Sequence, residues 1–283
     1  MKIISVQNNK GGVGKSVSVG FISQLLAYLD KRVLVVDLDP QSNLTMMLGA
    51  FIEDSDDVID GIATSPVKNI SDLFIGRYAI KEDVESCIHD TIIENIKIIP
   101  SSPRHANTLS ILHQDNKMGN INIILKKALA TVKDDYDYIL IDSAPTIDAL
   151  TTNSLYCSDL VLTPVEDSDF SLKGLRETIR LIQKTKEQYG LDMTFGGAFL
   201  TRSERNTNSF KIFNNKYHSQ LGEYMLNTSI SKDVKVKEIS SMCVPILSYC
   251  PNTSSVIDYS KLIIELHILD DDAQQELINC ITE

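Results

Sequence analysis

The chain has 283 residues, of which 43% are hydrophobic and 23% charged, so its composition is that of a globular protein and excludes a disordered or collagen-like one. Its 27 Lys and Arg against 38 Asp and Glu give a net charge of −11, so the molecule as a whole repels DNA and anionic lipid, and a polyanion would need a local basic surface. The chain contains no apolar run of about 18 residues, no signal peptide and no C-x-x-C pair among its five Cys, so we expect a cytoplasmic protein with free thiols.

Short, continuous apolar runs alternate with longer amphipathic segments. The runs, which we expect to be strands buried on both faces of a parallel sheet, are residues 3–6, 33–36, 96–99, 138–141, 160–165, 195–200 and 244–247. Segments 17–29 and 172–182 place their apolar residues on one helical stripe. This alternation predicts one α/β domain over residues 1–283, with a doubly wound, mostly parallel sheet flanked by helices. We expect the acidic residues 50–95 to form an irregular surface elaboration.

A glycine-rich loop, Asn9-Lys10-Gly11-Gly12-Val13-Gly14-Lys15-Ser16, follows the first predicted strand, and a predicted helix begins at Val17. Glycines allow backbone N–H groups to point inward, and a helix N-terminus adds its partial positive charge at the same place. In such a loop Lys15 reaches the β- and γ-phosphates, and the Ser16 hydroxyl is a ligand of Mg²⁺. The order therefore predicts a P-loop nucleoside triphosphatase, against the alternative of a βα turn that binds nothing. The predicted nucleotide-binding residues in the loop are Lys10, Gly11, Gly12, Val13, Gly14, Lys15, Ser16 and Val17.

Because of Lys10 the loop reads Lys-Gly-Gly-x-Gly-Lys-Ser, which is the deviant Walker A motif, and here the chain resembles the ParA/MinD family of ATPases, most closely its ParA-type partition ATPases. The resemblance continues through VLVVDLDPQSNLT (33–45), YILIDSAPTIDAL (138–150), LVLTPVEDSDFSLKGL (160–175) and YCPNTSSVIDY (249–259). In that order these segments are similar to the family's switch I, its Walker B with switch II, the segment that follows, and its C-terminal Y-x-P-x-S segment.

The resemblance implies three catalytic residues: Lys10, Lys15 and Asp39. ATP is expected to lie between two subunits of a homodimer, where Lys10 crosses to the partner and neutralises phosphate charge there. Asp39 is expected to orient or activate the attacking water. Phosphoryl transfer needs mainly positioning and charge neutralisation, which these groups supply together with Mg²⁺.

The expected Mg²⁺ site contains Ser16, Asp37 and Asp142. Asp37 and Asp39 are two residues apart at a strand end, where parallel sheets bind ligands, although a capped strand end would use the same residues. Asp142 ends another apolar strand, as a Walker B acid does, and reaches Mg²⁺ through water. The resemblance also places adenine near Pro251.

Residues 201–240 carry three more cations than anions. Within this stretch Ile230 to Lys237 resembles the family's I-P-R-x-V-R segment, with Lys232 and Lys235 in place of the arginines. Lysines are point charges that suit loose contact with phosphates better than base reading. The predicted DNA contacts are Lys232, Lys235, Lys237 and Arg205, and the alternative is a solvated charged face.

Three functions follow from the resemblance. The first is a DNA partition ATPase, whose ATP-bound dimer coats nonspecific DNA, associates with the nucleoid, and is stimulated by a ParB-like centromere-binding protein. The alternative is a MinD-like membrane-cycling ATPase, which uses a basic C-terminal amphipathic helix. Residues 262–283 here carry six acids and no Lys or Arg, so we do not expect membrane binding. The third is a metabolic or assembly enzyme, for which no second substrate motif is present.

Overall fold

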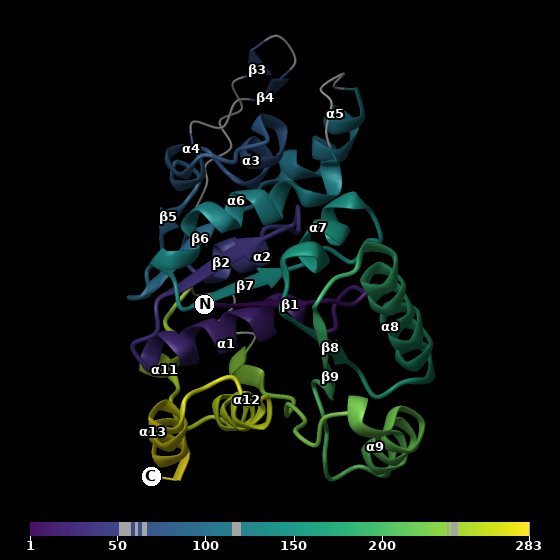
Figure 1. The fold of residues 1–283 in the computed structure, drawn as a ribbon. Helices are drawn as coiled ribbons and strands as arrows, with labels where there is room; N and C mark the ends of the chain where they lie inside the picture. Colours follow the sequence, from purple (N-terminus) through teal and green to yellow (C-terminus); the bar gives the residue numbers. More distant parts are fainter. Residues whose placement is uncertain are drawn as a thin grey trace.

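A computed structural model of the chain describes residues 1–50, 58–59, 62–63, 67–114, 120–236, 238 and 243–282. The described strands form a seven-stranded sheet in the order β5-β6-β2-β7-β1-β8-β9 (Figure 1). Every neighbouring pair is parallel except β5–β6. The predicted doubly wound, mostly parallel sheet is therefore confirmed. Its strands are β1 (Lys2–Val6), β2 (Val33–Asp37), β5 (His89–Asp90), β6 (Ile96–Ile99), β7 (Tyr138–Asp142), β8 (Leu160–Val165) and β9 (Thr194–Leu200).

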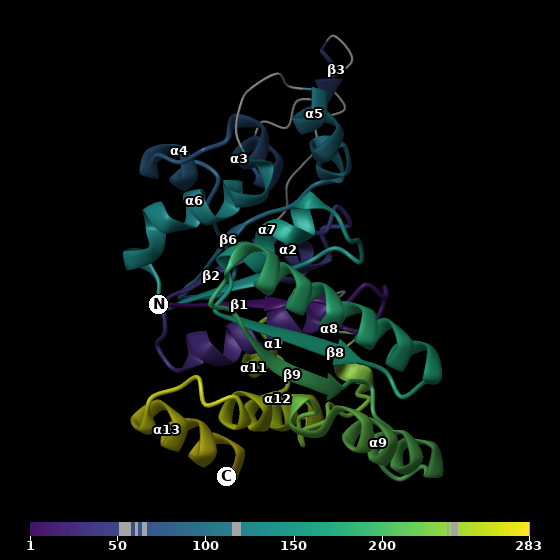
Figure 2. The same cartoon turned by 45° about the vertical axis from the view of Figure 1, so that its right-hand side comes forward.

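Helices cover both faces of the sheet (Figure 2). Alternate strand residues point to opposite faces, so that Ile4 and Val35 pack in the core under α1 whereas Ile3 and Leu34 pack in the core under α6. The first face carries α1 (Lys15–Tyr28), α11 (Ile246–Tyr249), α12 (Ser254–Glu265) and α13 (Asp271–Thr282). The second carries α3 (Ile70–Gly76), α4 (Lys81–Glu85), α5 (Thr108–Gln114), α6 (Ile124–Val132), α7 (Ala149–Cys157) and α8 (Asp169–Tyr189). Outside these layers lie α2 (Asn43–Met47) and α9 (Asn208–Leu221), the short hairpin β3 (Val58–Ile59) and β4 (Ile62–Ala63), and the 3₁₀ turns η1 (Pro103–Asn107), η2 (Ile121–Ile123), η3 (Lys133–Asp135) and η4 (Gly222–Tyr224).

The C-terminal helices are anchored on the body of the protein. The rings of Phe21 on α1 and Tyr259 on α12 stack with their centroids 4.7 Å apart, and the Tyr259 hydroxyl lies 2.9 Å from Ser18 Oγ. The Tyr138 hydroxyl donates a hydrogen bond of 2.7 Å to the carbonyl oxygen of Ile268, just before α13. Leu277 on α13 is fully buried in the same core as α1. The apolar side of the C-terminal segment therefore packs inward.

Two expectations about local structure differ from the observed fold. The predicted strand 244–247 is absent, because Pro245 precedes the short helix α11 and Ile246 donates its N–H to Gln24 Oε1. A short apolar run does not distinguish a strand from a buried helical turn. Within the segment 50–95, expected to be irregular, the described residues 67–95 include α3 and α4, which bury Leu73, Phe74 and Val84. Much of the acidic run in that segment lies outside the described residues.

The five Cys are all free, as expected. Among the helices of the described ranges, none combines the length and the apolar character needed to cross a membrane.

Candidate functional site

The glycine-rich loop joins the end of β1 to the start of α1. Gly12 and Gly14 have φ angles of +77° and +89°, a left-handed region that glycine adopts without a steric penalty. Gly14 caps α1 without any side-chain acceptor, and the first turn of α1 contains no acidic residue. The first N–H groups of the helix are therefore available to an anion.

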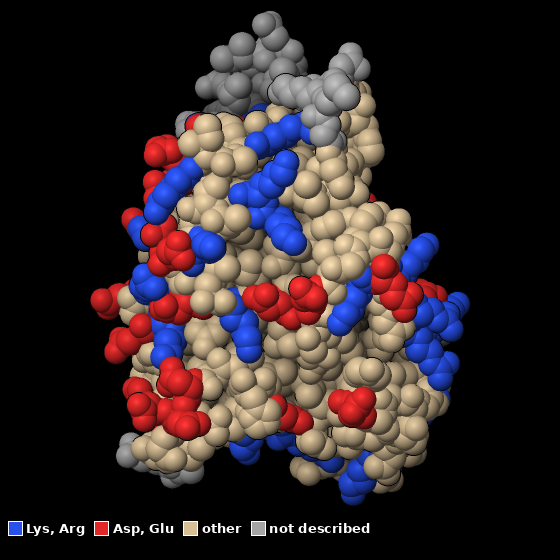
Figure 3. Space-filling model, viewed as in Figure 1, with Lys and Arg blue, Asp and Glu red and all other residues tan. Residues whose placement is uncertain are grey.

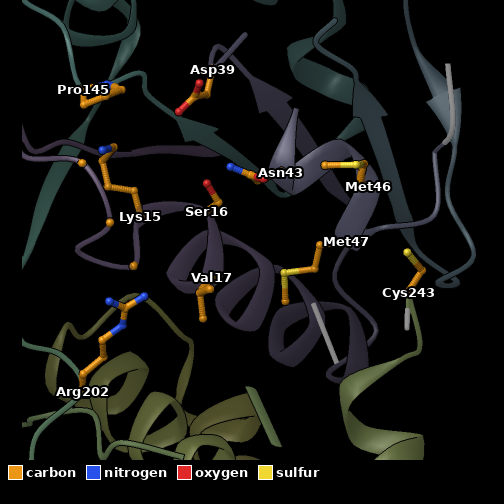
Figure 4. Close-up of a pocket in the computed structure, with 13 residues that line it drawn as sticks. Lys15, Ser16, Val17, Asp39, Asn43, Met46, Met47, Pro145, Arg202 and Cys243 are labelled. Carbon is orange, nitrogen blue, oxygen red and sulfur yellow. The ribbon is translucent and has the colours of Figure 1, made fainter. Parts of the chain in front are cut away.

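The loop forms one wall of a cavity of about 560 Å³. Lys15 and Ser16 approach this cavity from the start of α1, Asp39 from the end of β2, and Pro145 from the segment after β7 (Figure 4). This volume lies within the range of about 300–1,000 Å³ that is usual for small-molecule sites. The loop and the segments resembling the two switches thus converge on one site. Its other lining residues are Gly11, Gly12, Gly14, Val17, Asn43, Met46, Met47, Arg202 and Cys243.

Lys15 is only 6% exposed, and its Nζ donates to the carbonyl oxygen of Lys10 at 3.3 Å. Burial lowers the pKa of Lys15, while the charges of Asp142 and Asp39 raise it. An ammonium group has three donors, so Lys15 keeps hydrogen-bonding capacity for oxygens in the cavity. This geometry suits the role in phosphate binding predicted for it.

Asp37 and Asp142 are paired in the register of β2 and β7, and both are fully buried. Asp37 accepts hydrogen bonds from the backbone N–H of Asp39 at 3.0 Å, from the N–H of Thr45 at 3.0 Å and from the Thr45 hydroxyl at 2.7 Å. Burial raises the pKa of Asp37 to about 6, although these hydrogen bonds oppose the shift. Asp37 therefore fixes the segment that presents Asp39, and its oxygens are already engaged.

Asp142 is different, because among the described residues only the Ser16 hydroxyl comes near its carboxylate oxygens, and no hydrogen bond to them has good geometry. Burial, followed by the charge of Asp37, raises the pKa of Asp142 well above its usual range, whereas Ser16 and Lys15 act in the opposite direction. A buried carboxylate without partners is costly, so this position fits a cation or the water shell of one. Mg²⁺ bound by the Ser16 hydroxyl, nucleotide oxygens and water would meet this requirement. No group of three His, Cys, Asp or Glu that could hold a metal by itself occurs among the residues described.

Asp39 lies half-buried at the cavity, where its Oδ1 accepts a hydrogen bond of 2.9 Å from the N–H of Gln41. That bond orients the carboxylate and leaves it facing the site. The position of Asp39 is compatible with the predicted contact to an attacking water.

Lys10 does not line this cavity. Its Nζ lies 2.7 Å from Glu166 Oε2 and 3.1 Å from Ser171 Oγ. The other oxygen of Glu166 lies 3.2 Å from Nη1 of Arg202, a residue that does line the cavity. Sequence reasoning missed Glu166 and Arg202. Each of these residues closely follows the end of a predicted strand, and this position was the signal in the sequence that could have identified them as site residues. Only the fold shows that they contact each other.

A second cavity of about 610 Å³ adjoins the first and shares Gly14, Val17 and Arg202 with it. Its walls include the apolar side chains of Ile230 and Tyr259, which suit a flat heterocycle. Its remaining lining residues are Thr201, Ser231, Lys232, Asp233, Val234, Val236 and Ser255. Pro251, predicted near adenine, is exposed and lines neither cavity, so the structure does not bring it to the site.

The predicted DNA contacts are largely engaged within the chain. Arg205 lies 2.7 Å from Oδ1 of Asp258, which is 2% exposed, and Lys232 lies 2.5 Å from Oε1 of Glu204. Lys235 Nζ lies 6.0 Å from the centre of the Tyr249 ring. Lys237 lies outside the described residues. The structure thus pairs two of the predicted contacts with acidic partners.

The chain is similar to several known proteins. A family model described as an AAA domain matches residues 1–195. The chain is 30% identical over 266 residues to the sporulation initiation inhibitor protein Soj of Bacillus subtilis, covering 94% of this chain and 98% of that protein. It is also 30% identical over 266 residues to the chromosome-partitioning ATPase Soj of Treponema pallidum, covering 94% and 96%. A solved structure of a putative plasmid partition protein from Borrelia burgdorferi, bound to AMPPNP, superposes with a TM-score of 0.72 at 23% identity and covers 98% of both chains.

Proposed function

This chain belongs to the ParA/MinD family of ATPases, in its ParA-type branch, and from that premise we propose that it is an ATP-dependent DNA partition ATPase. The observation that carries the proposal is that Lys15 and Asp39 line the cavity at the glycine-rich loop, with the buried carboxylate of Asp142 close enough to act on the charge of Lys15. The names of the relatives support partition of a chromosome or plasmid as its role.

The proposed cofactors are ATP and Mg²⁺. The loop N–H groups and Lys15 would bind phosphate oxygens, and Ser16 and Asp142 would hold Mg²⁺, directly or through water. Mg²⁺ supplies charge neutralisation at the β- and γ-phosphates. Asp39, whose backbone N–H donates to the carboxylate of Asp37 and whose Oδ1 accepts from the N–H of Gln41, orients the attacking water and accepts its proton. The adjoining cavity at Ile230 and Tyr259 would hold the base.

The proposed active form is a homodimer. Lys10 is directed to Glu166 and not into its own cavity, so the phosphate charge there is left for Lys10 of a second subunit to neutralise. This arrangement supports the role across the dimer that the resemblance implies. In this proposal the ATP-bound dimer binds nonspecific DNA, associates with the nucleoid, and is stimulated to hydrolyse ATP by a ParB-like protein.

The MinD-like alternative requires an apolar helix face that is free to enter a membrane. In α13 Leu277 is fully buried, and Ile268 before it is 6% exposed. Anionic lipid would in addition repel the acidic residues of this segment. These observations favour DNA over a membrane as the surface on which the protein cycles.

The test is a binding titration on a duplex of arbitrary sequence with ATP, with ADP and without nucleotide, each at two salt concentrations. The proposal expects binding only with ATP, together with faster hydrolysis when DNA and the centromere-binding product of a neighbouring gene are added. If the ATP form bound anionic vesicles and never DNA, the membrane-cycling function would replace this one.

A further inference from the structure

Helix α8 carries a row of cations on one side. Lys173, Arg176, Arg180 and Lys184 follow one another at intervals of three, four and four residues, which places them on the same face of a helix, and all four are exposed. The exposed Glu177 and Glu187 lie on this face as well, so that four cations and two acids leave it a net charge of +2. In Figure 3 Lys and Arg outnumber Asp and Glu at the right of the molecule, over α8, whereas acidic residues predominate at the lower left, near α11 and α13. This chain of net charge −11 thus concentrates positive charge on one helix.

Helix α9 extends the same surface. The Arg176 guanidinium donates a hydrogen bond of 2.7 Å to Gln220 Oε1 on α9, so the two helices lie side by side. Helix α9 contains Lys211 and Lys216 and no acidic residue. We refer to the cations of the α8 row together with Lys216, which lies one turn before Gln220 on α9, as the α8–α9 face. Its members are Lys173, Arg176, Arg180, Lys184 and Lys216.

The cations of the α8 row outnumber the acids beside them. Within the described ranges no acid forms an ion pair with Lys173, Arg180 or Lys184. By contrast, Lys232 and Arg205 have acidic partners at 2.5 and 2.7 Å. Exposed cations that form no ion pair are free to contact a polyanion.

The dimensions of the row suit duplex DNA. From Lys173 to Lys184 the helix rises about 16 Å, at about 1.5 Å per residue. The major groove of B-DNA is about 12 Å wide, so cations at the two ends of the row reach phosphates on both sides of a groove. Exposed Lys and Arg without a shaped base-reading element make phosphate contacts, which position a protein on DNA irrespective of sequence.

We propose that the α8–α9 face is a nonspecific DNA-binding surface of this protein, contacting the sugar-phosphate backbone of duplex DNA. The inference rests on the proposed partition function, since it assigns the surface by which the ATP-bound form holds DNA. The surface differs from the one predicted from the sequence, which consists of Lys232, Lys235, Lys237 and Arg205. It centres on the α8 row, in which Lys173, Arg180 and Lys184 form no ion pair with any of the described residues.

The experiment compares the wild type with the double variant Arg180→Glu plus Lys184→Glu, each with ATP, on a duplex of arbitrary sequence over a range of salt. The matched control is Lys126→Glu plus Lys127→Glu, which makes the same charge change at exposed positions of α6. The α8 variant should bind at least about tenfold more weakly, and the slope of log K against log salt should flatten by about 0.9 for each phosphate that the protein no longer neutralises. The α6 control should bind as the wild type does, apart from the small effect of net charge. Thermal melting should be the same for all three proteins, because the four substituted side chains are exposed.

Three results would count against the inference, and they are distinguishable. If the wild type binds DNA with ATP and the α8 variant binds equally well, the surface is wrong while the partition function stands. If the α6 control binds as weakly as the α8 variant, the effect is one of net charge and the surface is again wrong. If the wild type binds DNA in no nucleotide state, the proposed function itself fails, and the surface with it.

Discussion

Replacing Glu166 by Gln tests whether the ion pair with Lys10 holds the protein in its monomeric form. In the structure Glu166 bridges Lys10 at 2.7 Å and Arg202 at 3.2 Å. If Lys10 must cross to a partner's phosphates, the Lys10–Glu166 pair of each subunit has to break before the dimer closes. The Glu166→Gln variant removes the charge but keeps the shape of the side chain.

The magnitude follows from the exposure of the pair. The Lys10 side chain is 37% exposed and that of Glu166 27%, so the pair is partly screened and contributes about 1 kcal/mol. Two pairs in a dimer contribute about 2 kcal/mol, and about 1.4 kcal/mol corresponds to a factor of ten, so the variant should lower the dimer dissociation constant by up to about 30-fold. This is an upper value, because the Gln oxygen still accepts a hydrogen bond from Lys10.

The assay is sedimentation velocity over a range of protein concentration, with Mg²⁺ and a non-hydrolysable ATP analogue. The matched control is Glu187→Gln, which removes one negative charge at an exposed position near the far end of α8. Lys10→Ala should fail to dimerise, and Glu166→Gln should not restore dimerisation to it. A Glu166→Gln dimer as weak as the wild type, or weaker, would refute the reasoning.

Further predictions concern the nucleotide site itself. Lys15→Ala should abolish binding of a fluorescent ATP analogue, since its ammonium is the buried cation at the cavity, and wild-type affinity would exclude the assignment. Asp39→Ala should bind ATP but hydrolyse it very slowly and accumulate as a dimer, which light scattering and a phosphate-release assay measure together; normal turnover would contradict it. Asp142→Asn should raise the melting temperature of the nucleotide-free protein at neutral pH, because the folded-state pKa of Asp142 is raised and its ionisation is therefore a cost that the amide removes. The difference in melting temperature between the variant and the wild type should shrink as the pH falls, because the wild-type carboxyl then becomes protonated. In addition, Mg²⁺ and ATP should stabilise the wild type but not the variant.

Local order along the chain was enough to predict the strand, the glycine-rich loop and the helix that follows it. The segment consists, without a gap, of a strand, glycines at positions 12 and 14, the tripeptide Gly-Lys-Ser and a helix. The conformation of such a segment depends on residues that are neighbours in sequence. The parallel sheet was predictable for a related reason, because strands buried on both faces read as continuous apolar runs. The resemblance then supplied the roles proposed for Lys10 and Asp39, which spacing alone does not provide.

What only the tertiary structure decided are contacts between residues far apart in the chain. Lys10 and Glu166 are separated by 156 positions, and the partner of Lys10 depends on where β8 ends relative to β1. The strand predicted at 244–247 became helix α11, since Gln24 on α1 satisfies the N–H of Ile246 there. The charges of Lys232 and Arg205 were visible in the sequence, but their acidic partners were not. The energy of a charged group depends on the charges and the solvent around it in space. The sequence therefore determined which cations exist, whereas the fold decided which of these cations form ion pairs with acids of the same subunit.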